Sequence, residues 1–139
     1  MRALLLTIFF SFIIKCDPLF SQNSNQHPID QWLNDCIKQN QSTAEMVECA
    51  EEALKKWDKE LNKVYKELMQ LLDTSSQKKL KDSQKIWLNY RDEEFSFIEK
   101  LYSTKDGTMF IPMRYFDKIN IVKNRVITLM SYLQLIKEM

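Results

Sequence analysis

Glycine and histidine are almost absent from this sequence, with one residue of each type in 139. A single glycine cannot build the glycine-rich loop that cradles phosphate groups. The single histidine, His27, leaves no Ser-His-Asp arrangement, and no histidine stands near a cysteine with the spacing of a metal site. We expect His27 to be a solvated residue in a polar leader. The sequence therefore disfavours an enzyme and favours a binding protein that needs no cofactor and no metal ion.

A net charge is also missing, since 20 basic and 19 acidic side chains give a formal charge of +1. Proteins that bind nucleic acid or an anionic membrane surface carry an excess of lysine and arginine. The balance found here gives no reason to expect either partner. We expect a protein partner instead.

No apolar run is long enough to cross a membrane. Residues 3–14 are uncharged and mostly apolar, whereas a membrane-spanning helix needs about 20 such residues. A short apolar stretch behind a basic start is typical of a secretory signal peptide, and we place its end after Ser21. A buried N-terminal helix is one alternative. Another is a lipoprotein attached at Cys16, which Lys15 disfavours because a small residue normally precedes the lipidated cysteine. We therefore expect an exported protein, periplasmic or secreted, with a signal peptide at residues 1–21, a polar leader at 22–27 and a single helical domain at 28–139.

Cysteine is scarce as well, and signal cleavage would leave two of the three cysteines, Cys36 and Cys49. Two cysteines in an exported chain indicate a disulfide. Closing a loop of about 14 residues in this way would stabilise the fold by roughly 3 kcal/mol. Two free thiols are the alternative, and the spacing by itself does not define a metal site.

Helical periodicity, in contrast, is abundant. From Pro28 to about Asn40, apolar residues share one face of a short helix. Ser42 and Glu45 have the spacing of a capping box, and an apolar a/d stripe runs through the helix that follows, at residues 43–73. The apolar positions of this stripe are 47, 50, 54, 57, 61, 64, 68 and 71.

Two further helices follow this one. Thr74 and Gln77 repeat the capping-box spacing near the start of a helix at 76–103. Residues 103–112 contain the sole glycine and form the one clear loop. The buried positions expected beyond residue 75 are Leu80, Trp87, Leu88, Phe95, Ile98 and Leu101, then Ile119, Val122, Val126, Leu129, Leu133 and Ile136. The fold class is therefore all-α: an antiparallel bundle of three long helices plus one short N-terminal helix, with one disulfide.

Polar residues interrupt the stripes at matching places. If the first two long helices fold back about a turn near residue 74, Asp58 faces Arg91, and Tyr65 faces Gln84 two helical turns away. A guanidinium in an apolar interface needs such a carboxylate. We therefore expect an interhelical polar cluster that fixes the register of the bundle, composed of Asp58, Asn62, Tyr65, Gln84 and Arg91. A carboxylate-centred catalytic site is the alternative, although no histidine or thiol stands near to support it.

Two stretches carry an ordered set of residues that resembles a known family: "DCIKQNQSTAEMVECAEEALKKWDKELNKVYKELMQLL" and "LKDSQKIWLNYRDEEF". Together they are similar to the LprI-type lysozyme-inhibitor domain family of small exported bacterial proteins. The matching positions are Cys36, Thr43, Met46, Cys49, Trp57, Asp58, Leu61, Asn62, Tyr65, Gln84, Trp87, Arg91, Asp92, Gly107, Thr108, Met109 and Arg125. The resemblance covers about residues 35–130. It implies lysozyme inhibition only for the founding type, since most relatives have no assigned role.

The chain departs from the family pattern at two cysteines. Family members often have one further cysteine after the Arg-Asp pair and another before the terminal arginine. This chain has Phe95 at the first place and Phe116 or Asp117 near the second. Their joint absence is expected if an apolar contact replaces a second bridge. This supports pairing of the two remaining cysteines and leaves residues 104–113 less tethered.

The first functional hypothesis is an exported, non-enzymatic binding protein that inhibits a lysozyme or a similar wall-degrading enzyme. Such enzymes are often strongly basic, so an inhibitor should present acidic side chains. Acidic residues are expected toward one end of the helical pair: Glu45, Glu48, Glu51, Glu52, Asp92, Glu93, Glu94 and Glu99. Lysines gather toward the other: Lys78, Lys79, Lys81 and Lys85. The helix dipole also explains acids in a first turn, without any partner.

The loop at 103–112 is a second candidate contact. It could enter the cleft of an enzyme, with Asp106 meeting a charged group and with Met109 and Phe110 as apolar contacts. The alternative is a simple connector whose Met109 and Phe110 fold back into the core. The candidate partner-binding residues are Asp106, Gly107, Thr108, Met109, Phe110, Glu48 and Glu52.

The second functional hypothesis is a structural or stress-related interaction protein of the cell envelope, without inhibitory activity. Apolar stripes on three helices could serve an oligomer as well as a closed bundle.

Overall fold

The computed structural model describes residues 26–138, which form four helices without any strand. α1 spans Pro28–Gln39, α2 Thr43–Leu71, α3 Thr74–Tyr102 and α4 Phe110–Lys137. The expected all-α class is confirmed. The predicted signal peptide and most of the predicted leader lie outside the described residues. None of these four helices has both the length and the apolar character needed to cross a membrane.

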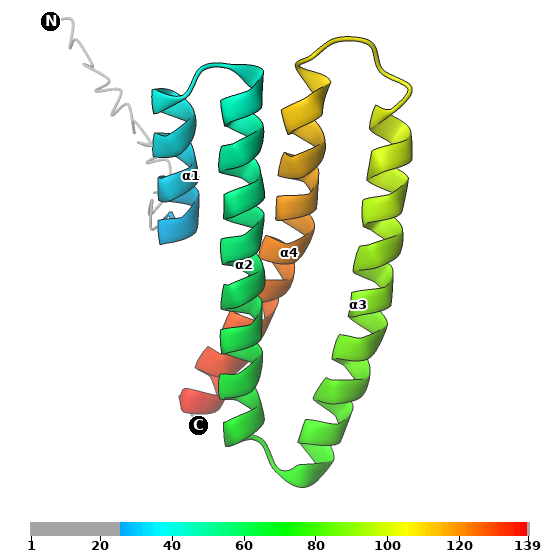
Figure 1. The fold of residues 1–139 in the computed structure, drawn as a ribbon. Helices are drawn as coiled ribbons and strands as arrows, with labels where there is room; N and C mark the ends of the chain where they lie inside the picture. The colour runs from blue at the N-terminus through cyan, green and yellow to red at the C-terminus, as the bar shows by residue number, and fades with distance from the viewer. Residues whose placement is uncertain (1–25, 139) are drawn as a thin grey trace, which may run out of the picture.

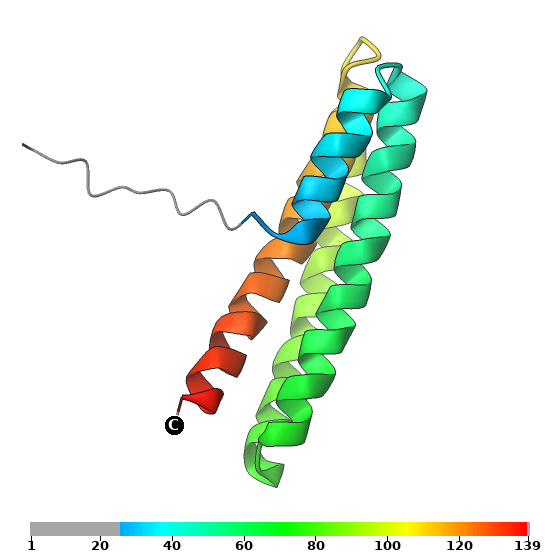
Figure 2. The same cartoon turned by 90° about the vertical axis from the view of Figure 1, so that its left-hand side faces the viewer.

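Consecutive helices run in opposite directions along one long axis (Figure 1). α4 therefore returns in the same direction as α2, and these two helices make the most extensive contact in the described part of the chain. α1 is short and lies along the half of this pair that is nearest the connection between α1 and α2 (Figure 2). The result is a tight unit of α1, α2 and α4, with α3 on its outer side.

The helix starts follow from local capping. Ser42 and Glu45 form the expected capping box, in which each side chain bonds the backbone of the other residue. The second expected box was wrong, because Asp73 caps α3 by accepting hydrogen bonds from the backbone N–H groups of Ser75 and Ser76. The side chain of Gln77 instead reaches back to carbonyl groups at the end of α2.

The expected loop is shorter than the sequence indicated. α4 already begins at Phe110, and Pro112 lies buried in its first turn. Proline is tolerated there because the first helical N–H groups have no intrahelical partner. The connection between α3 and α4 is therefore reduced to residues 103–109.

The hydrophobic core lies between α2 and α4, with α1 closing one end. Trp57, Leu68, Val122, Val126 and Leu129 are its largest fully buried side chains. The remaining buried members are Leu33, Cys49, Ala50, Ala53, Leu61, Val64, Ile119 and Leu133. Most of the two predicted stripes is thus confirmed, although Leu71, the last position of the first stripe, is exposed.

α3 contributes little to this core. Along its whole length, all of which is described, Ile98 is the one buried residue. Leu80, Trp87 and Phe95 are only partly buried against the core, and Leu101 is exposed, contrary to the expectation. α3 contacts α4 more than it contacts α2.

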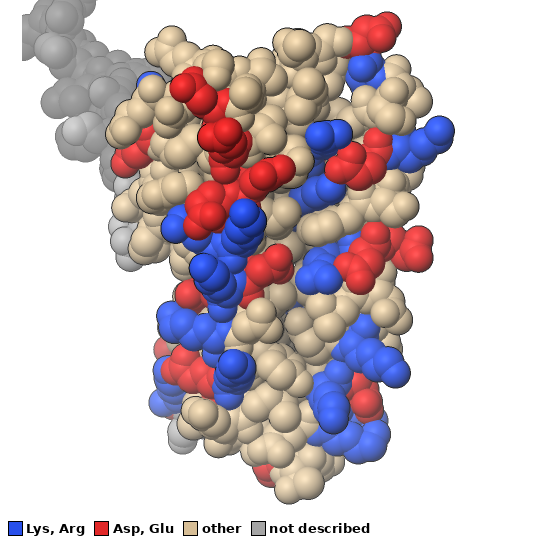
Figure 3. Space-filling view, in the orientation of Figure 1, with Lys and Arg blue, Asp and Glu red and all other residues tan. Residues whose placement is uncertain are grey.

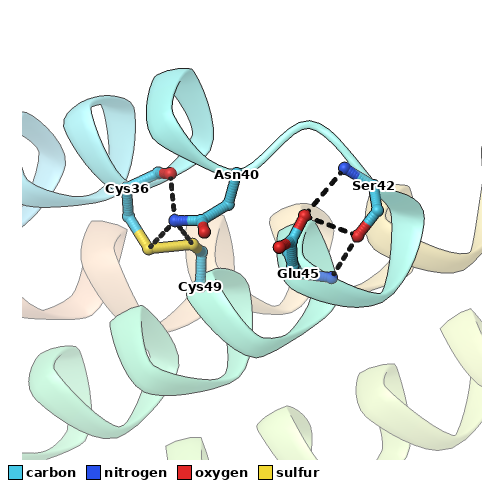
Figure 4. Close-up of a disulfide and its surroundings, with 5 residues drawn as sticks. All are labelled: Cys36, Asn40, Ser42, Glu45 and Cys49. Carbon is cyan, nitrogen blue, oxygen red and sulfur yellow. Dashed lines mark hydrogen bonds between the residues drawn. A yellow bond between two sulfur atoms is a disulfide. The ribbon is translucent and has the colours of Figure 1, made fainter.

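The predicted disulfide is confirmed and ties α1 to α2 (Figure 4). The Cα atoms of Cys36 and Cys49 are 5.9 Å apart. Asn40 follows α1 and donates a hydrogen bond of 2.8 Å to the carbonyl of Cys36. The bridge therefore sits directly beside the turn that reverses the chain.

His27 is not the solvated leader residue that we expected. It occupies the N-cap of α1 and accepts a hydrogen bond from the backbone N–H of Ile29. Its ring also stacks on the indole of Trp57, with the ring centroids 4.4 Å apart. The folded domain therefore includes His27, because Trp57 offers an apolar face to the start of α1.

Candidate functional site

The predicted ion pair between α2 and α3 is present as a loose contact. Asp58 Oδ1 lies 3.7 Å from Arg91 Nη1. Arg91 donates its shorter hydrogen bonds, 2.7 and 2.9 Å, to Asp92 on its own helix. Burial raises the pKa of Asp58, and the guanidinium of Arg91 offsets this effect only in part.

The other expected members of the polar cluster are placed differently. Asn62 is exposed and donates to the backbone carbonyl of Asp58, one turn earlier in α2. Tyr65 is half-buried against the core. Gln84 accepts a hydrogen bond of 3.0 Å from Arg125 Nε on α4 and not from Tyr65. The expected pairing of Gln84 with Tyr65 was therefore wrong, because α4 provides the partner of Gln84.

Trp87 lies between two arginines. The guanidinium carbons of Arg91 and Arg125 are each 5.8 Å from the centroid of its ring. Arg125 also donates to Ser83 Oγ at 3.3 Å. Burial lowers the pKa of the Arg125 guanidinium. Arg125 was not among the expected members of the polar cluster, although its place beside the apolar positions 122, 126 and 129 of α4 was a usable signal.

The loop at residues 103–109 is displayed at the same end of the bundle as the connection between α1 and α2 (Figure 1). Asp106, Gly107 and Thr108 are exposed, and so is the side chain of Met109. Gly107 has a φ of 112°, which side chains rarely tolerate and which therefore suits glycine. Phe110 is half-buried next to the ring of Tyr102, so of the two expected apolar contacts Met109 is the one with its side chain toward solvent.

The ends of this loop are held by polar contacts between α3 and α4. Tyr102 donates a hydrogen bond of 2.6 Å to Asp117. Glu99 accepts hydrogen bonds from Arg114 and Lys118. These contacts join α3 to α4 on the two sides of the loop.

Several acidic side chains at this end of the bundle have partners within the chain, but only some of these partners carry a positive charge. Figure 3 shows acidic side chains over the first turns of α2 and basic ones further along the same face. Glu51 accepts a hydrogen bond from Tyr115, and Glu52 pairs with Lys56 at 3.4 Å. Glu45 is engaged in the capping box, whereas Glu48 is exposed.

A shallow groove of about 1360 Å³ lies below the start of α1, between α2 and α4. Val64 and Leu133 form part of its apolar floor. The basic side chains on its rim all have acidic partners: Lys123 with Asp30, Lys63 with Glu60 and Lys137 with Glu67. No group of three potential metal ligands occurs within residues 26–138.

The fold and these contacts define a class: a small all-α bundle, closed by one disulfide, with a displayed loop and several exposed apolar side chains. The family described as "Lysozyme inhibitor LprI" matches residues 36–129. The chain therefore belongs to the LprI lysozyme-inhibitor family, as its resemblance implied.

The fold is also found among solved structures. One of them is a crystal structure of an uncharacterized protein from Burkholderia thailandensis, with a TM-score of 0.74 and 25% sequence identity. The similarity covers 80% of this chain and 56% of the other, so this chain spans a little over half the length of that structure. No curated protein matches the sequence.

Proposed function

We propose that this protein is exported, periplasmic or secreted, and inhibits a lysozyme-type wall-degrading enzyme by binding it, without catalysis of its own. The observation that carries this proposal is membership of a lysozyme-inhibitor family over residues 36–129. The apolar run at residues 3–14 supports export, and the disulfide between Cys36 and Cys49 suits an oxidising compartment.

The contact surface that we propose is the end of the bundle with the loop at 103–109. An exposed methionine on a short loop is well suited to insert into an enzyme cleft, because it offers adaptable apolar contact. Met109 has this exposure, at 64%. Asp106 and Glu48 add negative charge at the same end, whereas Glu52 is already paired with Lys56.

A turbidity assay of wall lysis tests this function, with the chain lacking residues 1–21 added to several lysozyme types. We expect lysis to slow at micromolar excess. Met109→Ser should weaken inhibition about tenfold, as expected for an apolar anchor at an interface. Leu135→Ser is the matched control, since Leu135 is 60% exposed at the opposite end of α4 and should not matter. Unchanged lysis with every lysozyme type would exclude the inhibitor function.

A second candidate is an envelope interaction protein without inhibitory activity, which could act by self-association. Four exposed apolar residues on α3 favour it: Ile86, Tyr90, Phe97 and Leu101. Light scattering at two protein concentrations distinguishes the two candidates. A stable dimer that buries these side chains, together with no effect on lysis, would support this second function.

A further inference from the structure

Arg91 and Arg125 flank the same tryptophan but differ in how their charge is compensated. Arg91 has two carboxylates near it, those of Asp58 and Asp92. Arg125 forms no ion pair with any residue between 26 and 138. Its partners are neutral, the amide oxygen of Gln84 and the hydroxyl of Ser83.

The positive charge of Arg125 is therefore only partly compensated by its neighbours. Withdrawing a guanidinium from water is costly unless a carboxylate and further acceptors replace its hydration. Nε and Nη2 of Arg125 have acceptors. Nη1 has none within the described part of the chain. A guanidinium donates best to a planar carboxylate, in short charge-assisted bonds.

Arg125 lines a recess of about 230 Å³ between α3 and α4. The recess is lined by Trp87, Tyr90, Ile121, Asn124, Arg125 and Thr128. No acidic residue lines it, so its one formal charge is positive. Whole small molecules usually occupy pockets of about 300–1,000 Å³. The recess is therefore sized for a single group presented by a larger ligand.

Exposed apolar side chains lie on the face of α3 that carries Tyr90. Ile86 and Phe97 are 70% and 60% exposed. They lie four and seven residues from Tyr90, so all three share one face of α3. Tyr90, which lines the recess, is itself half exposed. Tryptophan, tyrosine and arginine at the centre of an apolar surface are the residue types that dominate protein–protein binding energy.

We infer that the recess at Arg125 binds the carboxylate of an acidic side chain from a protein partner, whose neighbouring apolar residues pack on Ile86, Tyr90 and Phe97. The carboxylate accepts hydrogen bonds from Arg125 and from the amide of Asn124 at the rim. This site is distinct from the loop at 103–109, and the inference does not depend on the partner being a lysozyme.

Three probes test the site by NMR titration of the folded chain without residues 1–21, observed at the indole N–H of Trp87. The probes are acetyl-Leu-Glu-Leu-amide, acetyl-Leu-Gln-Leu-amide and acetate. We expect a saturable shift with the glutamate peptide in the millimolar range, and at least about tenfold weaker binding of the glutamine peptide, which lacks the charge. Acetate should also bind at least about tenfold more weakly, because it makes no apolar contact.

Matched variants assign the effect to one arginine. Arg125→Gln should weaken binding of the glutamate peptide by about tenfold or more, whereas Arg91→Gln, which is equally near Trp87 but does not line the recess, should leave it within about twofold. Asn124 is exposed, and Asn124→Asp should weaken binding to a similar extent by placing an acid beside Arg125. This variant also tests the site if Arg125→Gln does not fold.

Three results would overturn the inference. The first is the absence of a saturable shift with the glutamate peptide. The second is a lack of discrimination: the two peptides bind equally, or Arg125→Gln and Asn124→Asp bind the glutamate peptide as tightly as the unchanged chain does. The third is acetate binding as tightly as the glutamate peptide, which would identify a general anion site in place of a site for a partner's side chain.

Discussion

The contact between α2 and α4 and the contact made by α3 differ in how they hold helices together. α2 and α4 make the most extensive contact in the described part of the chain, and they bury large residues such as Trp57 and Leu129 completely. α3 instead meets its neighbours through half-buried aromatic rings, arginines and hydrogen bonds, including Gln84 to Arg125 and Tyr102 to Asp117.

This difference separates stability from recognition within one small domain. Hydrophobic stabilisation grows with the apolar area removed from water, so the α2–α4 contact should provide most of the stability. The contacts of α3 are partly solvated and contribute less each, which leaves aromatic and cationic side chains near the surface. Those are the side chains that a partner can use.

The largest expected change in stability comes from replacing each of two tryptophans by alanine. Trp57→Ala should lower the free energy of unfolding by about 3–5 kcal/mol, because it empties a fully buried site between α2 and α4. Trp87→Ala should lower it by less than about 2 kcal/mol, because Trp87 is only half-buried on α3. Urea unfolding followed by circular dichroism measures both. Equal losses would show that α3 stabilises the fold as much as α4 does.

An intermediate effect is expected from the disulfide. Cys36→Ala with Cys49→Ala should cost roughly 3 kcal/mol by freeing a loop of the unfolded chain. Asn40→Ala keeps the bridge and loses the side-chain hydrogen bond to the Cys36 carbonyl, so it should cost about 1 kcal/mol. Hydrogen exchange should rise in α1 in the double variant while the α3–α4 contacts stay protected. Faster exchange confined to α3 would contradict this assignment.

The smallest effect is a pH dependence of opposite sign at two carboxyl groups. The hydrogen bond from Lys118 lowers the pKa of Glu99 from 4.5, so its stabilisation is present above that value and is lost as the pH falls through the lowered pKa. Burial raises the pKa of Asp58 from 3.8, so its ionised form costs stability at neutral pH and that cost disappears on acidification.

Two variants separate these contributions. Between about pH 7 and about pH 3, Glu99→Gln should lose less stability than the unchanged chain, and Asp58→Asn should lose more. Each variant should differ from the unchanged chain by about 0.3 kcal/mol in the loss of unfolding free energy. The difference is small because both side chains are more than 40% exposed and solvent screens their charges. Urea midpoints across this pH range check the signs. The same sign for both variants would contradict the assigned causes.

Local sequence signals predicted the helices well and the site only in part. The capping box at Ser42 and the stripe from Ala50 to Leu68 depend on residues one or two turns apart, so short-range rules sufficed. The contact of Asp58 with Arg91 also followed from a simple hairpin. The partner of Gln84 did not, because it lies on α4, far away in the chain.

At His27 and in the loop between α3 and α4, local sequence signals also failed to predict tertiary contacts. A histidine next to a polar run resembles a solvated residue, and only the packed core brings Trp57 under its ring. Phe110 and Pro112 were expected in the loop, but they lie in the first turn of α4, where Pro112 is buried.

By itself, the sequence determined the all-α class, the disulfide between Cys36 and Cys49 and membership of the LprI family. Periodicity, capping and cysteine pairing act over short distances along the chain, which is why they could be read directly. Only the tertiary structure decided that α4 and not α3 fills the core, and that Arg125 lacks a carboxylate partner within the described residues. Both outcomes depend on how closely helices distant in sequence can approach, and side-chain packing in three dimensions sets that distance.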